Sequence, residues 1–106
     1  MPTVVGEKDL LKQVMDWLAL HRVFHYRNNT GALVANGGAK KRFVRFGWPG
    51  SPDIICVRRG QYVGIECKAL NGEQSQAQRN FQSDLEAAGG KYILCRKLED
   101  AIEGLR

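Results

Sequence analysis

Residues 52–68 read PDIICVRRGQYVGIECK, and this segment anchors the prediction of the whole architecture. Two runs rich in β-branched and aromatic residues, 54–57 and 62–68, flank the polar, glycine-containing segment 58–61, which is typical of a turn. Two strands joined by so short a connection most simply form an antiparallel pair. The segment therefore predicts a β-hairpin, with Asp53 at the start of its first strand.

The second strand of this hairpin carries alternating polar and apolar residues. Because side chains alternate along a strand, Glu66 and Lys68 project to one face, while Ile65 and Cys67 project to the other, towards an apolar core. The turn folds the chain back and brings Asp53 beside this end of the strand. Two carboxylates and one ammonium group are therefore expected at one edge of the sheet.

Such a trio suits metal-assisted hydrolysis of a phosphodiester. Mg²⁺ or Mn²⁺ is held by one or two carboxylates, here Asp53 and Glu66, and the backbone carbonyl of Cys67 can add a third ligand. Lys68 can orient the attacking water or stabilise the charged transition state. The alternative is a plain cross-strand ion pair, and the Pro-Asp pair at hairpin distance favours the site.

A helix is predicted before the hairpin, from Val5 or Gly6 to about His21. Its apolar residues recur at helical spacing and form one stripe: Leu10, Leu11, Val14, Met15, Trp17 and Leu18. Glu7 precedes this stripe along its centre. It either stabilises the helix start, where the helix dipole favours an acid, or reaches a site beside the core, and spacing alone leaves both interpretations open.

A second helix is predicted from Ser75 to about Ala88, and glycines 89–90 end it. Ser75 and Gln78 have the spacing of a capping box, although the Gln78 amide can also lie near the lysine or a phosphate. The expected buried stripe of this helix is Ala77, Phe81, Leu85 and Ala88.

The remaining elements complete an α/β fold in one domain, residues 1–106. A strand is predicted over 91–95 and a short helix over 98–105. The order is helix, β-hairpin, helix, strand and helix, with the helices packed on a mixed sheet. The segment 24–52 is predicted to be turn-rich, with a loose basic hairpin around the turn signal Asn36-Gly37-Gly38.

The charge balance favours a polyanionic partner. The 106 residues include 16 Lys and Arg against 11 Asp and Glu, a formal charge of +5, and nucleic acid is the commonest polyanion. We expect phosphate contacts from Arg27, Lys40, Lys41, Arg42 and Arg45. Arg58 and Arg59, in the turn of the 52–68 hairpin, are expected to be solvated instead.

Three cysteines, at positions 56, 67 and 95, lie in apolar runs and form no CxxC pair. They indicate neither a disulfide framework nor a zinc cluster, and are expected to be reduced side chains of an intracellular protein. No apolar run has the length of a membrane helix, and the first residues lack the apolar core of a signal peptide.

Three segments together resemble the VRR-NUC (virus-type replication-repair nuclease) domain of the PD-(D/E)xK nuclease superfamily. They are 50–55 (GSPDII), 64–68 (GIECK) and 75–78 (SQAQ). The stretch 27–31 (RNNTG) is also similar to the segment that precedes the hairpin in that family. The resemblance covers nearly the whole chain, and it implies a restriction-endonuclease-like core in a single stand-alone domain.

The resemblance also implies the site. Asp53 and Glu66 would bind Mg²⁺ or Mn²⁺ with the Cys67 carbonyl, and Lys68 would be the catalytic lysine. Glu7 would complete the metal shell directly or through water. Gln78 would be the glutamine of the second helix, counted among the catalytic residues. Asn28, in the resembling 27–31 stretch, is grouped with the basic residues as DNA-binding.

The expected function is a metal-dependent DNA endonuclease. Stand-alone relatives are similar to Holliday junction resolvases, so the resemblance implies a homodimer that cleaves branched DNA in DNA repair. The expected location is the cytoplasm of a bacterial or phage-infected cell. The alternatives are a non-catalytic DNA-binding module and a sequence-specific restriction-type endonuclease.

Overall fold

The computed structural model of the chain describes residues 6–37 and 40–106. In chain order the elements are α1 (Glu7–Leu20), β1 (Phe24–Arg27), β2 (Gly31–Gly37), β3 (Lys40–Phe46), β4 (Ile54–Arg58), β5 (Gln61–Cys67), α2 (Gln76–Ala87), β6 (Lys91–Cys95) and α3 (Leu98–Gly104). The predicted helices and the hairpin over 52–68 are confirmed. Val5, one predicted helix start, and Gly38 of the predicted turn lie outside the described residues. None of the described helices has the length and apolarity to cross a bilayer.

The main sheet has four strands in the order β1-β4-β5-β6. Strands β4 and β5 are antiparallel, with Ile54 opposite Ile65, while β6 runs parallel to β5. The sheet is therefore mixed, as predicted. The sequence patterns predict a turn-rich segment over 24–52 with one hairpin, and no strand at its first four residues, Phe24–Arg27. They form an edge strand that pairs with β4, a non-local contact that so short a run does not reveal.

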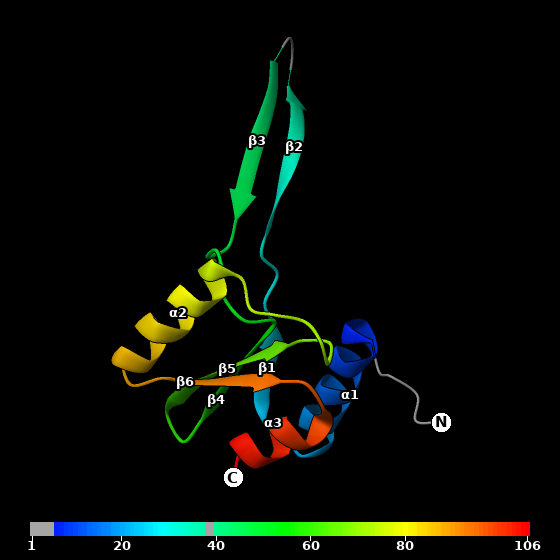
Figure 1. Cartoon of the computed structure of the whole chain (residues 1–106), viewed down its shortest axis with the longest axis vertical. Coiled ribbons are helices and arrows are strands. Elements are labelled where there is room, and N and C mark those ends of the chain that lie inside the picture. Colours follow the sequence, from blue (N-terminus) through cyan, green and yellow to red (C-terminus); the bar gives the residue numbers. More distant parts are fainter. Residues whose placement is uncertain (1–5, 38–39) are drawn as a thin grey trace.

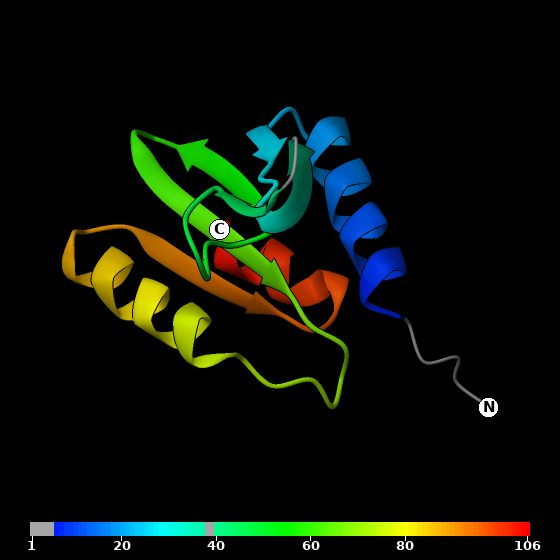
Figure 2. The ribbon, with the colours of Figure 1, turned by 90° about the horizontal axis from the view of Figure 1, so that it is seen from above.

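The densest packing lies on one face of this sheet, beneath α1 and α3. Helix α1 lies against β1 and β5, and α3 lies against β6 and α1, as Figures 1 and 2 show. The core residues come from all these elements and include Leu10, Val14, Leu18, Ile54, Cys56, Ile65, Cys67, Cys95 and Ala101. The predicted stripe of α1 and the inward direction of Ile65 and Cys67 are confirmed.

Helix α2 lies over the other face of the sheet and packs loosely on it (Figure 1). Its predicted capping box is present, with the Ser75 hydroxyl accepting from the Gln78 N–H. The prediction of a buried stripe is wrong, because none of the twelve residues of α2 is buried. Phe81 and Leu85 are half-buried and Ala77 is exposed. The helix stands off the sheet and leaves a pocket, described below, instead of a closed core.

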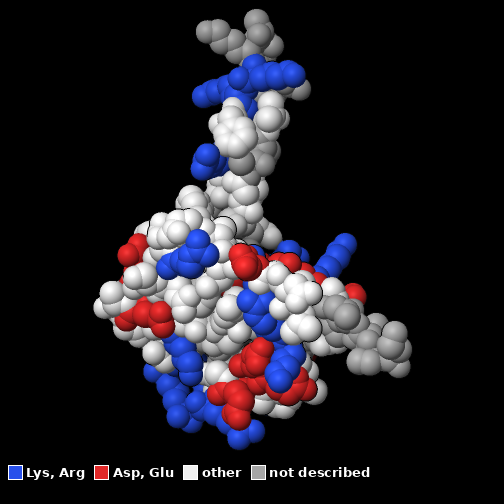
Figure 3. Space-filling model, in the orientation of Figure 1, with Lys and Arg blue, Asp and Glu red and all other residues white. Residues whose placement is uncertain are grey.

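Strands β2 and β3 form an antiparallel hairpin that projects from the body (Figure 1). We call this hairpin, residues 31–37 and 40–46, the arm. Within the described residues its strands pair with each other and with no strand of the main sheet. Exposed apolar side chains such as Phe43 and Val34 lie on it together with Lys and Arg, which gather towards its outer end in Figure 3. The predicted basic hairpin is therefore confirmed.

Candidate metal centre

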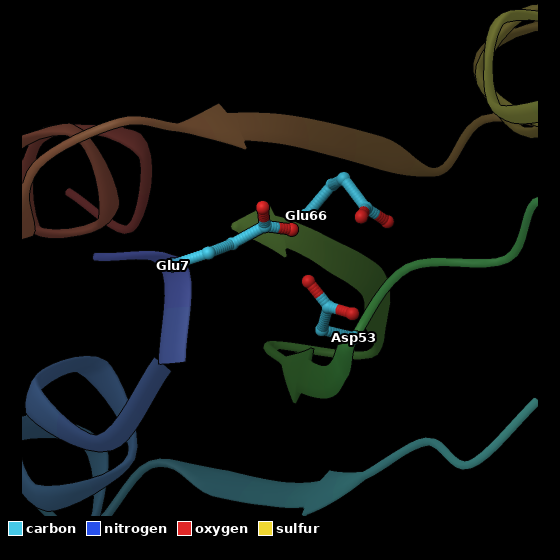
Figure 4. A group of neighbouring side chains, drawn as sticks. All are labelled: Glu7, Asp53 and Glu66. Atoms are coloured by element: carbon cyan, nitrogen blue, oxygen red, sulfur yellow. The ribbon is translucent and has the colours of Figure 1, made fainter. Parts of the chain in front are cut away.

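Three elements place carboxylates at one end of the β4–β5 pair. Asp53 immediately precedes β4, Glu66 is next to last in β5, and Glu7 is the first residue of α1. One carboxylate oxygen from each of these three residues lies within 4.8 Å of the other two, and Figure 4 shows the groups converging. The predicted meeting of Asp53 with Glu66 is thus confirmed, and Glu7 joins them.

Asp53 is fixed by the segment around it. Pro52 is buried and packs so closely on Gly64 that a Cβ on Gly64 would lie 2.5 Å from the Pro52 Cγ. The Asp53 Oδ2 accepts a hydrogen bond from the Cys67 N–H at 2.8 Å. The carboxylate is thereby attached to the end of β5, within reach of Glu66. The Cys67 backbone borders the cluster, and its carbonyl as a metal ligand stays a prediction.

Asn28 forms hydrogen bonds with the segment 51–53. Its N–H donates to the Asp53 carbonyl at 2.8 Å. Its side-chain nitrogen donates to the Ser51 hydroxyl at 2.8 Å and to the Pro52 carbonyl at 3.0 Å. The sequence prediction grouped Asn28 with DNA-binding residues, and that contact stays a prediction. What the structure adds is that Asn28 holds the Pro-Asp turn in place.

A glycine allows this loop to meet α2. Gly50 has a φ of +80°, and a Cβ there would lie 2.2 Å from the Ala77 carbonyl oxygen. A side chain at this position is therefore excluded both by conformation and by space. The loop that carries Asp53 is pressed against the first turn of α2.

Glu66 is the buried acid of the group, with 2% of its surface exposed. Its Oε1 accepts from the Gln78 side-chain nitrogen at 3.0 Å. Its Oε2 is buried and has no hydrogen-bond partner among the described residues. Burial, followed by the nearby charge of Asp53, raises the pKa of Glu66 to about 8. Such an orphaned buried carboxylate oxygen calls for a cation or a proton.

Gln78 has its predicted capping role and also makes a contact with Glu66 that was not predicted. Its Oε1 accepts from the Ser75 N–H at 2.8 Å and completes the capping box. Its amide nitrogen donates to the Glu66 carboxylate, and the predicted position of the amide near Lys68 or a phosphate stays a prediction. The capping bond fixes the side chain, so that the amide holds the buried carboxylate in one orientation.

Lys68 follows β5 and is partly buried. Its positive charge is close enough to Glu66 to oppose the rise in that residue's pKa. The lysine stem lies near Gly72, where a Cβ would be 3.6 Å from the Lys68 Cδ. Lys68 therefore borders the acid cluster, and among the described residues its ammonium group forms no ion pair, which leaves it available to a ligand.

The donor set fits a hard divalent cation. All three side chains offer carboxylate oxygen, the ligand that Mg²⁺ and Mn²⁺ prefer. The group consists of carboxylates alone. Among the described residues it contains no histidine or cysteine, the ligands that zinc favours. The orphaned Oε2 of Glu66 is the atom that such a cation would satisfy.

Three of the predicted DNA-contacting cations lie on the arm, away from the acids, whereas the backbone of Arg27 pairs with Ile54, next to Asp53. Lys41, Arg42 and Arg45 are exposed on β3 of the arm, and the Arg45 guanidinium lies over the Phe43 ring at 5.4 Å. Arg27 is exposed at the end of β1. The side chain of Lys40 lies outside the described part of the chain. Arg58 and Arg59, by contrast, lie at the opposite end of the β4–β5 hairpin from Glu66.

The sequence prediction missed a pocket of about 380 Å³ between α2 and the sheet. We call it the aromatic slot. Its apolar walls are Trp48, Ile55, Tyr62, Phe81, Leu85 and Ala88, and Asn28, Ser51 and Asp84 also line it. The apolar stripe of α2 was the available signal, but helical periodicity does not tell whether a stripe closes against a sheet or lines a gap.

No family model, curated protein or solved structure matches this chain. The resemblance to the VRR-NUC domain therefore stays a prediction from the sequence motifs.

Proposed function

We propose that this chain is a Mg²⁺- or Mn²⁺-dependent DNA endonuclease of the PD-(D/E)xK type. The observation that carries the proposal is the approach of the Glu7, Asp53 and Glu66 carboxylates to within 4.8 Å of one another, beside Lys68. The formal charge of +5 and the exposed cations of the arm favour a polyanionic substrate. The motif resemblance adds the preference for branched DNA, a homodimer and a role in DNA repair.

In this mechanism the three carboxylates would hold the cation, with Asp53 oriented by the Cys67 N–H and Glu66 by the Gln78 amide. A bound divalent ion lowers the pKa of a water and neutralises charge on the phosphate. The attacking water gives its oxygen to phosphorus and its proton to the leaving oxygen as one P–O ester bond breaks. The ammonium group of Lys68 orients that water or stabilises the added negative charge.

A cleavage assay on plasmid and four-way junction DNA tests the proposal. The native chain should cleave with Mg²⁺ or Mn²⁺ and stop with EDTA. Lys68→Ala and Asp53→Asn should each lower the rate by roughly 100-fold or more, because each removes a charged group from the reacting phosphate or its cation. Glu86→Gln, which neutralises an exposed acid of α2 outside the cluster, is the matched control.

Three results would count against the proposal. Native rates in Lys68→Ala and Asp53→Asn would remove these residues from the chemistry. Tight binding of junctions without turnover in any divalent metal would favour a non-catalytic DNA-binding module, whereas cleavage at one defined sequence in linear duplex would favour a restriction-type enzyme.

A further inference from the structure

Two chain segments, the loop before β4 and helix α2, connect the aromatic slot to the acid cluster. Ser51 lines the slot, and Asp53 follows it by two residues. Phe81 also lines the slot, and it lies about one helical turn after Gln78, whose amide binds Glu66. A strand whose phosphate lay at the acids would therefore pass the slot with its neighbouring nucleotides.

The walls of the slot suit a flat apolar ligand. The Trp48 and Phe81 rings meet edge to face, with centroids 5.9 Å apart and planes at 86°. Trp48 is nevertheless 66% exposed, so most of its indole is uncovered. Tyr62 lies across the slot on β5. Aromatic side chains of this kind bind nucleobases by stacking, which every base permits.

The polar rim argues for a base and against a phosphate. Asp84 lines the slot together with Asn28 and Ser51, and a carboxylate group accepts hydrogen bonds without donating them. It would repel a phosphate but accept from the exocyclic amino group of cytosine, adenine or guanine. Thymine lacks that group, and its ring N3–H lies between two carbonyl oxygens that a carboxylate repels. The volume of about 380 Å³ falls within the range of small-ligand pockets.

We propose that the aromatic slot binds one unpaired nucleobase of the DNA strand held at the acid cluster, and that Asp84 makes it prefer amino-bearing bases over thymine. The proposal rests on the proposed function for the identity of the strand. Unpaired bases at a branch point enter such a slot at low energetic cost, because they are already unstacked. The slot would thus recognise the interruption of the duplex itself.

Binding without cleavage provides the test. Single-stranded oligonucleotides of dC, of dT and of abasic sites only, all of one length, are titrated in EDTA, with tryptophan fluorescence as the readout. The chain has two tryptophans. The dC strand should quench fluorescence in the native chain and in Trp17→Phe, and the quench should disappear in Trp48→Phe.

The affinities of variants for the same oligonucleotides provide a second form of the test. Phe81→Ala should weaken binding of dC strands roughly tenfold and leave an abasic strand unchanged, while Leu20→Ala, an exposed leucine of α1, should change neither. Asp84→Asn should reduce the preference for dC over dT roughly fivefold. Circular dichroism verifies folding, and if Phe81→Ala does not fold, the Trp48 quench in the native chain decides.

The proposal is overturned if the abasic and dC strands quench Trp48 equally, or if the Phe81→Ala affinity is native. It is also overturned if sedimentation shows that Phe81→Ala dissociates a dimer, since a second copy would then fill the slot. The two proposals fail separately. Metal-dependent cleavage without a Trp48 quench would refute only the proposed base site. A base-dependent quench without metal-dependent cleavage would refute only the proposed catalytic function.

Discussion

The two faces of the four-stranded sheet differ in how completely they are covered. Under α1 and α3, residues such as Leu18, Ile54 and Ile65 have no exposed surface. Under α2 no helix residue is buried, and the same sheet carries a buried acid and an open pocket. The difference teaches that the first face supplies stability, so that the second can hold groups that a closed core would exclude.

The largest effect should come from shortening a side chain of the closed face. Leu18→Ala should lower the free energy of unfolding by about 2–5 kcal/mol, through lost burial and a cavity. Leu85→Ala, the matched change under α2, should lower it by less than about 1.5 kcal/mol, because Leu85 is only half-buried. Urea denaturation measures both, and equal losses would show that the two faces share the work of stabilising the fold.

The second prediction concerns the buried acid in the metal-free chain. The pKa of Glu66 is raised from 4.5 to about 8, chiefly by burial and then by Asp53, so the folded state binds this proton more tightly than the unfolded chain. The resulting stabilisation is complete below about pH 4.5 and is lost as the pH rises through 8. Unfolding in EDTA from pH 5 to pH 9 should show the loss.

The control for this pH dependence is Glu66→Gln, which keeps the side-chain shape without the ionisable group. Its stability should change less over the same pH range than that of the native chain. Identical profiles in the two proteins would assign the pH dependence to other groups.

A smaller effect is expected where α2 meets the acids. Gln78→Ala removes the amide that orients Glu66 and should weaken Mn²⁺ binding roughly 10- to 100-fold. Gln76→Ala changes an exposed glutamine two residues earlier on α2, bonded to Asn80, and should leave the affinity unchanged. Isothermal titration calorimetry compares them, and similar losses in both would indicate a general effect on the helix.

The smallest effect should come from the arm, outside both faces. Lys41→Ala combined with Arg42→Ala should weaken DNA binding several-fold and flatten the dependence of log K on log salt concentration by about 2. Cleavage per bound complex should be unaffected, because these residues lie away from the acids. The double change of Arg58 and Arg59 to Ala is the comparison, and an equal change in its salt slope would extend the DNA surface to that end of the hairpin.

Local sequence patterns predicted most of the fold. The alternation around Glu66, the stripe of α1 and the Ser75 capping box are short-range features, and the structure has them. The edge strand Phe24–Arg27 and the gap under α2 depend on which elements meet across the chain. Neither a four-residue run nor a helical period contains that information.

The candidate site also has a part that local sequence patterns predict and a part that they do not. Asp53 and Glu66 could be brought together from the hairpin alone, since register follows from the short turn. The distance of Glu7 from them could not, because it depends on how α1 docks. The hydrogen bonds of Asn28 to Ser51 and Pro52 likewise join segments more than twenty positions apart, and no local pattern marks them.

The close approach of Gly50 to Ala77 has a mechanical consequence. Asp53 is three residues beyond this contact, and Glu66 is tied to the same helix end by Gln78. Any tilt or axial shift of α2 would therefore displace both carboxylates together, that of Asp53 through the loop and that of Glu66 through the Gln78 amide. The spacing of Asp53 and Glu66 therefore depends on the position of α2, and a lengthened loop between Gly50 and Asp53 would alter it even with every acidic side chain retained.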